Sequence, residues 1–245
     1  MYMIDLPLDP AALTRFAWRH GHGGGRAPLD EDFGYAAHAW LAAALGEQAP
    51  RPFRLIENRT GLRLLGYASV GVDRLARRAK DYALPDAFSV CDWPAAASKE
   101  MPAVWTSGRR LGFELRASPV VRGERERDAY LVEVERAHAE GREPAGRAEI
   151  YGQWLVRQFG RDGAAQATSE AVSLIGFRRV LTLRQSRTGE AGRRRGVERP
   201  DALFSGELTV HDPEAFARLL ERGIGRHRAF GFGMLLLRPP GPAIR

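Results

Sequence analysis

The chain has 245 residues, of which 44% are hydrophobic and 27% charged, a balance that is ordinary for a soluble globular protein and allows one large domain or two small ones. No apolar run approaches the ~20 residues that span a bilayer, and the first residues lack the basic region and cleavage site of a signal peptide, which excludes a membrane protein and predicts a cytoplasmic one. The formal net charge is +7, with every basic residue except Lys80 and Lys99 an arginine, and this favours a polyanionic partner because guanidinium groups match phosphate oxygens bidentately.

The first part of the chain predicts the element order β, α, β, β, α, β. Apolar and polar residues alternate in the first strand, and Asp9 before Pro10 is typical of a helix N-cap followed by the first helical position. The expected elements are a strand at 1–8, helices at 10–19 and 30–45, a hairpin of 53–57 and 62–70, a helix at 72–82 and a strand at 88–93.

The second part of the chain predicts the same order again. The expected elements are a strand at 109–121, a charged turn at 123–128, a helix at 147–160, strands at 171–183 and 203–210, a helix at 213–222 and a strand at 232–237. The charged segment 130–146 is interpreted as a loop, with a short strand at 131–134 as the alternative. The sequence therefore predicts an α+β fold of two tandem ferredoxin-like (RRM-like) βαββαβ domains with antiparallel sheets, at 1–94 and 104–245.

Histidine and cysteine residues form no metal-binding pattern. His20 and His22 flank a glycine without a carboxylate or third histidine to complete the set, and the single cysteine, Cys91, has no second thiol for a zinc knuckle or a disulfide. We interpret 20–25 as a solvated loop and Cys91 as a small core residue, and we expect neither a metal nor a cofactor. Three further histidines are interpreted as surface or loop residues, with a contact to the nucleic-acid backbone as the alternative for the last of them: His138, His211 and His227.

The helix expected at 30–45 carries the first candidate site residues. At 100° per residue its apolar side chains share one face, which would pack on a sheet; they are Phe33, Ala37, Trp40, Leu41 and Ala44. Tyr35 and His38, three residues apart, share a different face. This position argues against a core histidine, and a solvated surface histidine is the alternative to a functional one.

Arginines concentrate between the two middle strands of the second domain. The segment 178–199 contains Arg178, Arg179, Arg184, Arg187, Arg193, Arg194, Arg195 and Arg199. Only Glu190 and Glu198 oppose them, and Gly189 and Gly192 lie near the centre. The pattern predicts a long hairpin or loop with a positive tip that can lie along a phosphate backbone, whereas the alternative is an ordinary solvated face.

A glycine-rich segment at 222–233 follows the last helix. Its glycines permit φ > 0 and close backbone approach, and its arginines supply donors for an anion, so we expect Gly223, Gly225, Arg226 and Arg228 to face phosphate. The order helix, glycines, strand excludes a dinucleotide-binding fingerprint, which needs the glycines before the helix. Phe230 and Phe232 alternate with glycines, so both rings should share one face of the last strand and pack in the core.

Taken together, the paired domains, the Tyr35-x-x-His38 helix and the sequence GIGRHRAFGFG at 223–233 resemble the CasE family, the CRISPR-associated repeat-RNA endoribonucleases of the type I-E system. The likeness extends through RPFR at 51–54 and GRRLGFELRASPVV at 108–121, and it covers nearly the whole chain.

The resemblance implies metal-independent cleavage of CRISPR repeat precursor RNA on the 3′ side of its stem-loop. The ribose 2′-OH attacks, a 2′,3′-cyclic phosphate remains, and the mature crRNA is retained with other subunits of the Cascade complex. His38 matches the catalytic histidine of the family and Tyr35 the tyrosine one turn before it, while Arg54 is a guess for the group that stabilises the transition state. Whether His38 acts as base, acid or both stays open. His20 or His22 could also approach the scissile phosphate, but each is a much weaker candidate for the catalytic histidine than His38.

Two other functions compete with this one. A non-catalytic RNA-binding protein is suggested by RAFGFG at 228–233, which resembles the aromatic strand signature of RNA-recognition motifs, although that signature belongs to the third strand of its domain. A DNA-binding protein or a structural subunit of an RNA-guided complex is the third hypothesis.

Overall fold

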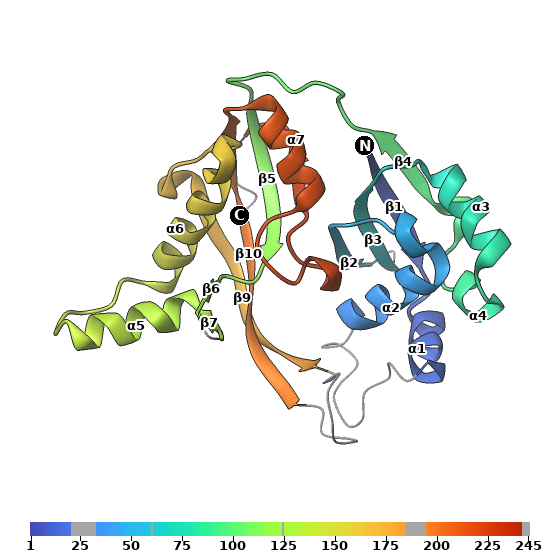
Figure 1. Ribbon diagram of the computed structural model, residues 1–245, viewed down its shortest axis with the longest axis horizontal. Helices are drawn as coiled ribbons and strands as arrows, with labels where there is room; N and C mark the ends of the chain where they lie inside the picture. Colours follow the sequence, from blue (N-terminus) through green and yellow to red (C-terminus); the bar gives the residue numbers. More distant parts are fainter. Residues whose placement is uncertain (21–32, 60, 124, 185–194, 242–245) are drawn as a thin grey trace. The chain divides into compact units, whose positions relative to one another are not determined.

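The structure of the protein is a computed structural model that describes residues 1–20, 33–59, 61–123, 125–184 and 195–241 (Figure 1). The chain divides into two compact units. Unit 1 comprises Met1–Met101, Val180–Glu198 and Arg228–Gly231, and unit 2 comprises Pro102–Arg179, Arg199–His227 and Phe232–Arg245. Unit 1 therefore includes two segments from late in the sequence.

Unit 1 is built on a 4-stranded sheet in the order β2-β3-β1-β4. Its strands are β1 (Tyr2–Leu8), β2 (Phe53–Asn58), β3 (Gly61–Ala68) and β4 (Ala97–Glu100). All neighbouring strands are antiparallel, with β1 between β3 and β4. Numbered along the chain, this 4-1-3-2 order is the ferredoxin-like arrangement that the sequence predicts.

Helices cover one face of this sheet (Figure 1). They are α1 (Pro10–Arg19), α2 (Phe33–Leu45), α3 (Val72–Tyr82) and the short α4 (Pro85–Phe88). Alternate residues of β1, Ile4, Leu6 and Leu8, enter the core with Trp40 of α2, whose indole N–H donates to the carbonyl oxygen of Ala87 at 2.8 Å. Each large apolar side chain buried in this way contributes roughly 1.5–3 kcal/mol, so the core anchors α2 on the sheet.

The strand expected at 88–93 is wrong. Phe88 ends α4, a 3-10 turn η3 spans Trp93–Ala95, and β4 lies in the segment interpreted as a connector. The rings of Phe88 and Trp93 stack at 5.9 Å and the Trp93 indole N–H donates to the Phe88 carbonyl oxygen at 3.0 Å, so the chain folds back on itself here. Cys91 forms only an isolated bridge with Leu8.

Unit 2 repeats the arrangement around β5. Its sheet has the order β11-β5-β10-β8, and β9 also pairs with β10. The strands are β5 (Arg110–Ala117), β8 (Ala165–Gln166), β9 (Val172–Arg184), β10 (Arg195–Val210) and β11 (Leu235–Arg238). The end of β9 and the start of β10 belong to the segment Val180–Glu198 of unit 1. The pairs of β10 with β5 and β8, and of β11 with β5, are antiparallel. The four main strands again follow the 4-1-3-2 order, which confirms the predicted fold class.

Two helices of unit 2 match the sequence analysis closely, namely α6 (Arg147–Phe159) and α7 (Pro213–Arg222). The carboxylate of Asp212 accepts hydrogen bonds from the N–H groups of Glu214 and Ala215 at 2.9 and 3.0 Å, which defines the start of α7. A small hairpin of β6 (Val120–Arg122) and β7 (Glu126–Asp128) replaces the expected charged turn. Single 3-10 turns η2 (Gly46–Gln48), η4 (Arg161–Gly163) and η5 (Ser169–Ala171) connect other elements.

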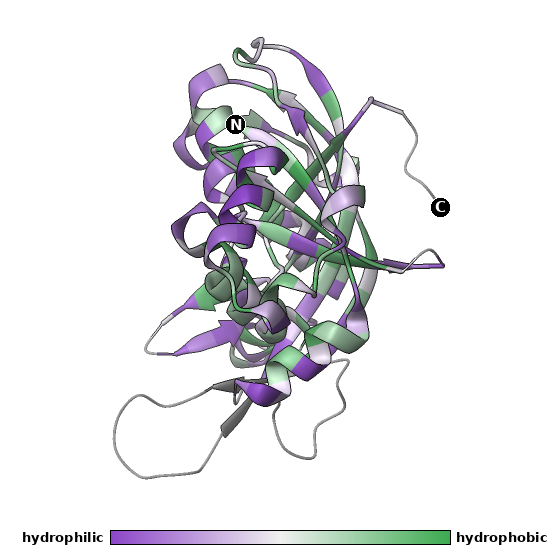
Figure 2. Ribbon diagram, turned by 90° about the vertical axis from the view of Figure 1, so that its right-hand side faces the viewer, coloured by the Kyte–Doolittle hydropathy of each residue, from purple (hydrophilic) through white to green (hydrophobic). Residues whose placement is uncertain are grey.

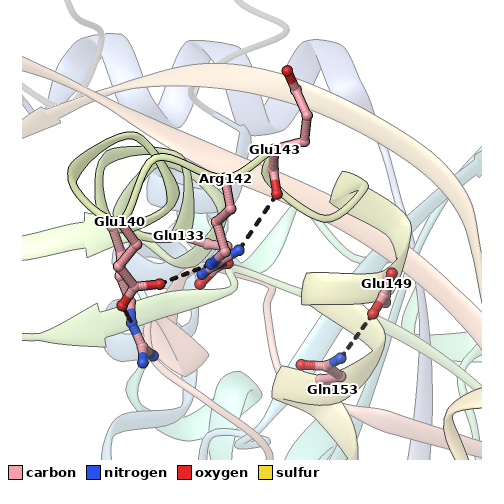
Figure 3. Close-up of polar contacts among 7 residues, drawn as sticks. Glu133, Glu140, Arg142, Glu143, Glu149 and Gln153 are labelled. Atoms are coloured by element: carbon pink, nitrogen blue, oxygen red, sulfur yellow. Dashed lines mark hydrogen bonds and ion pairs between the residues drawn. The ribbon is translucent and has the colours of Figure 1, made fainter.

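The loop expected at 130–146 is wrong for its first part, because helix α5 spans Ala129–Ala139, and is confirmed for 140–146. The Asp128 carboxylate caps it by accepting from the Tyr130 N–H at 2.8 Å. The charges that suggested a loop pair with one another: Arg142 donates to Glu133 at 2.6 Å and to Glu140 at 2.7 Å (Figure 3). Paired charges and the packing of α5 on α6 hold a helix that shows no clear apolar stripe.

Coloured by hydropathy, several helices carry hydrophilic and hydrophobic residues in turn along their length (Figure 2), as expected where one face packs on a sheet. Among the residues that the structure describes, no helix is both long and apolar enough to cross a membrane.

Candidate functional site

Helix α2 presents Tyr35 and His38 as the sequence predicts. Its apolar face is buried in the core of unit 1 through Ala37, Trp40 and Leu41, whereas Tyr35 and His38 are half-buried on another face. The core packing therefore holds the helix while the phenol and the imidazole remain partly accessible to a ligand.

The ring of Phe230 lies against both of these side chains within unit 1. It stacks on Tyr35 with ring centroids 5.8 Å apart and planes inclined by 11°, and it meets His38 edge-on at 5.1 Å and 68°. Phe230 belongs to the 3-10 turn η6 (Arg228–Phe230), which contacts α2 and β2 (Figure 1). Sequence analysis missed this contact.

The interpretation that Phe230 and Phe232 share one face of the last strand is wrong. Phe230 lies in η6 of unit 1, Phe232 belongs to unit 2, and β11 begins only at Leu235. The φ angle of Gly231 is 86°, a conformation that turns the chain between the two rings. Phe232 is buried and lies under the guanidinium of Arg116, with 4.6 Å from Cζ to the ring centroid.

Gly34 allows the turn η6 to approach α2 closely. A Cβ atom on Gly34 would lie 2.4 Å from the Phe230 carbonyl oxygen, a distance that real Cβ contacts do not reach. Because the obstacle is backbone, a larger residue would have to displace η6 or α2. A glycine next to a tyrosine on an otherwise strongly helical segment is the sequence signal that could have identified this contact.

The first half of the glycine-rich segment adopts alternating left-handed conformations in unit 2. The φ angles of Gly223, Gly225 and His227 are 72°, 75° and 62°. Gly223 ends α7 by donating its N–H to the Leu219 carbonyl oxygen at 2.8 Å, and a Cβ on Gly225 would lie 3.0 Å from the Trp154 ring. These two glycines thus serve the geometry of the loop, and their contact with phosphate stays a prediction.

Ion pairs hold the same half of the segment. The Glu126 carboxylate contacts the Arg226 Nε atom, the His227 Nε2 atom at 2.9 Å and, at 4.0 Å, the guanidinium of Arg199. His227 lies in a loop, as the sequence predicts, but its side chain is only 10% exposed. Burial, together with the neighbouring positive charge of Arg199, lowers the pKa of His227 below its usual value despite the opposing effect of Glu126.

The arginine-rich strands β9 and β10 contain both paired and undescribed side chains. Arg178 donates to Asp201 at 2.8 Å, and Arg116 adds two hydrogen bonds of 2.7 Å to the same carboxylate. Burial acts to raise the pKa of Asp201, but its hydrogen bonds and charge pairing with Arg116 and Arg178 outweigh this and lower it. The Arg178 side chain is still 56% exposed, so it can reach a ligand from this anchored position.

The other arginines that are predicted to bind RNA differ in exposure and in how much of them the structure describes. Arg179 is exposed on β9, and Arg228 is half-buried in η6 of unit 1. Arg184 and Arg195 are strand residues whose side chains are not described, and the tip with Arg187, Arg193 and Arg194 lies outside the described residues. Their contacts with RNA stay predictions.

Arg54 lies on β2, half-buried. Its neighbours Phe53 and Leu55 pack against the core that includes α2, so strand alternation directs Arg54 toward the opposite face of the sheet. A role in stabilising the transition state stays a prediction for this residue.

Two histidines have contacts of their own. His20 pairs through Nε2 with the Asp86 carboxylate at 3.0 Å, and this hydrogen bond lowers the pKa of Asp86; His22 lies outside the described residues. His211 contacts the Gln166 amide at 3.3 Å.

Cys91 is buried, as the sequence analysis expects, and burial raises the pKa of its thiol to about 12, which keeps it unreactive. In the described ranges, no group of three or more His, Cys, Asp and Glu side chains could hold a metal ion.

The arrangement on α2 suits proton transfer next to a bound anion. An imidazole can accept or donate a proton near neutral pH, and a phenol one helical turn away can donate a hydrogen bond to an oxygen of the same ligand. The Phe230 ring packs on both groups and adds no charge of its own.

Comparison with solved structures shows the same fold. A CRISPR endoribonuclease Cse3 bound to a 19-nt RNA is 22% identical, with a TM-score of 0.63 over 98% of this chain and 100% of that one. Cas6e from Escherichia coli K-12 is 19% identical, with a TM-score of 0.53 over 98% and 100%. A chain of a CRISPR RNA-guided surveillance complex in a pre-nicking state is 18% identical, also with a TM-score of 0.53 over 98% and 100%.

No curated protein matches the sequence significantly. A family model described as CRISPR associated protein matches residues 1–239. The tandem ferredoxin-like fold and this match over nearly the whole sequence lead to one conclusion: the chain belongs to the CRISPR-associated protein family.

Proposed function

We propose that the protein is a metal-independent endoribonuclease that cleaves CRISPR repeat precursor RNA on the 3′ side of the repeat stem-loop. The observation that carries the proposal is the pair Tyr35 and His38, half-buried on the core-anchored helix α2. Membership of the CRISPR-associated family and the fold shared with an RNA-bound CRISPR endoribonuclease support the choice of substrate.

In the proposed reaction the ribose 2′-oxygen attacks the adjacent phosphorus, forming a new P–O2′ bond. The P–O5′ bond breaks, so that one fragment ends in a 2′,3′-cyclic phosphate and the other begins with a 5′-hydroxyl. The proton lost by the 2′-OH and the proton gained by the 5′-oxygen balance, and His38 is suited to move one or both of them. Tyr35 would donate a hydrogen bond to a phosphate oxygen, where negative charge builds up in the transition state.

The arginine-rich β9 and β10 and the glycine-rich segment would hold the RNA. Arg178, Arg179, Arg226 and Arg228 are the described members of this set, and guanidinium groups suit phosphate oxygens. After cleavage, the protein would retain the mature crRNA and join the other subunits of Cascade in the cytoplasm. The fold match to a chain of an RNA-guided surveillance complex supports that partner.

The test is a cleavage assay in EDTA with a transcript of the CRISPR repeat from the same genome. Wild type should release a shorter fragment with a cyclic phosphate end, a transcript with a 2′-deoxy residue at the cut should stay intact, and His38→Ala should lose cleavage while binding RNA with nearly unchanged affinity. His138→Ala is the matched control, because His138 is an exposed histidine on α5. Cleavage by His38→Ala at the wild-type rate would overturn the assignment of that residue.

A non-catalytic RNA-binding protein is less well supported. The resemblance to an RNA-recognition signature requires aromatic rings on a central strand, whereas Phe230 lies in a 3-10 turn and Phe232 is buried. RNA binding without any fragment in the EDTA assay would favour this alternative.

A further inference from the structure

We propose that Phe230 is a positioning residue for the cleavage reaction, holding the imidazole of His38 and the phenol of Tyr35 in their working orientation. The inference rests on the proposed function of α2. It concerns a residue that the sequence analysis placed in the core of the last strand.

The geometry of the ring supports this role. Phe230 lies nearly parallel to the Tyr35 ring, with 5.8 Å between centroids, and presents itself edge-on to His38 at 5.1 Å. Offset stacking and edge contacts are the preferred arrangements of aromatic pairs, so both contacts are attractive. One phenyl group therefore restricts the rotation of both reactive side chains.

The backbone of the turn is seated as firmly as its ring. The close approach of the Phe230 carbonyl oxygen to Gly34 fixes η6 on α2 one residue before Tyr35, and η6 also contacts β2. The position of the ring is thus set by the main chain on one side and by the sheet on the other, which is what orientation of a catalytic pair requires.

Phe230 is not simply another core residue. The largest side chains of the unit 1 core, such as Phe16, Phe53 and Trp40, are at most 2% exposed, whereas Phe230 is half-buried. Truncation of Phe230 should therefore lower the free energy of unfolding less than truncation of a core phenylalanine does.

The turn η6 also carries Arg228, one of the predicted phosphate contacts, two residues before Phe230. The same short turn would then hold the RNA and orient the groups that cut it. Misplacement of reacting groups by about 1 Å can slow an enzyme about 100-fold without any loss of binding, and this predicts a selective effect on rate.

Single-turnover cleavage and equilibrium RNA binding should be measured for wild type, Phe230→Ala, Phe230→Leu and Phe230→Tyr. We expect Phe230→Ala to cut about 100-fold more slowly, with RNA affinity within about threefold of wild type, a change of less than about 0.7 kcal/mol in binding free energy. The cleavage rate of Phe230→Leu should lie between those of wild type and Phe230→Ala. Phe230→Tyr, which keeps the ring, should retain most of the wild-type rate. Tyr82→Leu, which removes an exposed aromatic ring from α3, is the control and should cut normally.

A second readout does not depend on activity. The His38 ring proton resonances in an NMR spectrum should shift in Phe230→Leu, because the ring current of the phenyl group is removed, and should change little in Tyr82→Leu. Wild-type cleavage by Phe230→Ala, equal losses of rate and affinity, or unshifted His38 resonances would overturn the proposal. If wild type itself does not cut, the proposed function fails, while the NMR comparison still decides whether Phe230 restrains His38.

Discussion

Two parts of the glycine-rich segment, residues 222–227 in unit 2 and Arg228–Gly231 in unit 1, are held by different kinds of contact. In unit 2, Arg226 forms an ion pair with Glu126, His227 contacts the same carboxylate, and Gly225 packs closely on Trp154. In unit 1, the Phe230 ring of η6 packs on Tyr35 and His38, and its carbonyl oxygen lies close to Gly34.

This difference fits the tasks proposed for each half. The contacts of Arg226 and His227 with Glu126 set the shape of a loop that would hold RNA, and a charged pair of this kind is weakened by salt. Aromatic packing of Phe230 on Tyr35 and His38 adds no charge of its own to that proposed site. Damage to the η6 contact should therefore lower the cleavage rate, whereas damage to the Glu126 cluster should lower stability and leave the rate nearly unchanged.

The largest effect is expected for Gly34→Ala. The added Cβ would clash with the Phe230 carbonyl oxygen and displace η6, so single-turnover cleavage should fall about 100-fold and the free energy of unfolding by about 1–3 kcal/mol. Gly152→Ala is the matched control, since a Cβ on Gly152 in α6 would meet nothing within 4 Å. It should leave the rate unchanged and stabilise the protein by up to about 1 kcal/mol. Equal rates for the two variants would contradict the role of the close approach.

The next effect is expected for Glu126→Gln. Loss of the carboxylate removes the counter-charge of Arg226 and the contact of Glu126 with the His227 ring, so urea denaturation should show a loss of about 1–3 kcal/mol in the free energy of unfolding. Cleavage of saturating RNA should stay within about threefold of wild type, because the η6 contact is intact. Glu214→Gln removes an exposed carboxylate on α7 and is the control. A cleavage defect as large as that of Gly34→Ala would erase the contrast between the two halves.

A smaller change is expected in salt dependence when Arg193, Arg194 and Arg195 are replaced by alanine. Each lost phosphate contact should reduce the slope of log affinity against log salt by roughly one unit, with a weaker affinity at every salt concentration. The rate at saturating RNA should be unchanged. Fluorescence anisotropy over a salt series measures the slope, and an unaltered slope would place the RNA contacts elsewhere.

The smallest effect is expected from the titration of His227. Its pKa is lowered in the folded protein, so the unfolded chain takes up the proton first as the pH falls through the usual histidine value of 6.5. The stability that this residue contributes is therefore present above about pH 6.5 and is lost as the pH falls through the folded pKa. Arg199, Arg226 and Glu126 face the ring, and the two arginines oppose its protonation.

Urea midpoints at pH 7.5 and 5.5 test this linkage. Wild type should lose more stability between the two values than His227→Asn, because asparagine tolerates the left-handed backbone conformation at this position and does not titrate. Equal losses of stability for the two proteins would show that groups other than His227 cause the fall in stability at acidic pH.

Local signals account for the parts of the fold that sequence reasoning predicts well. Asp9 before Pro10 and Asp212 before Pro213 mark the starts of α1 and α7, because an N-cap and a proline at the first helical position act within one turn. The helix expected at 30–45 also places Tyr35 and His38 away from the core, since helical periodicity alone separates the two faces.

Sequence patterns predict the wrong structure for two elements that lack a local signal, helix α5 and strand β4. Helix α5 shows no clear apolar stripe and depends on ion pairs such as that between Arg142 and Glu133 and on packing against α6. Strand β4 is exposed along its whole length, and its pairing with β1 is what makes it a strand. In both cases the stabilising partners come from other parts of the fold or from paired charges that composition cannot distinguish from a solvated loop.

Strand and helix periodicities and short motifs are local properties, so they suffice to predict the tandem ferredoxin-like order, the family and the helix that carries Tyr35 and His38. The packing of Phe230 on that helix, and the contacts of Arg178, Arg226 and His227 with carboxylates, become visible only in the folded chain. Such contacts join residues far apart in the chain, and they depend on close backbone approach and on burial, which a linear pattern does not contain.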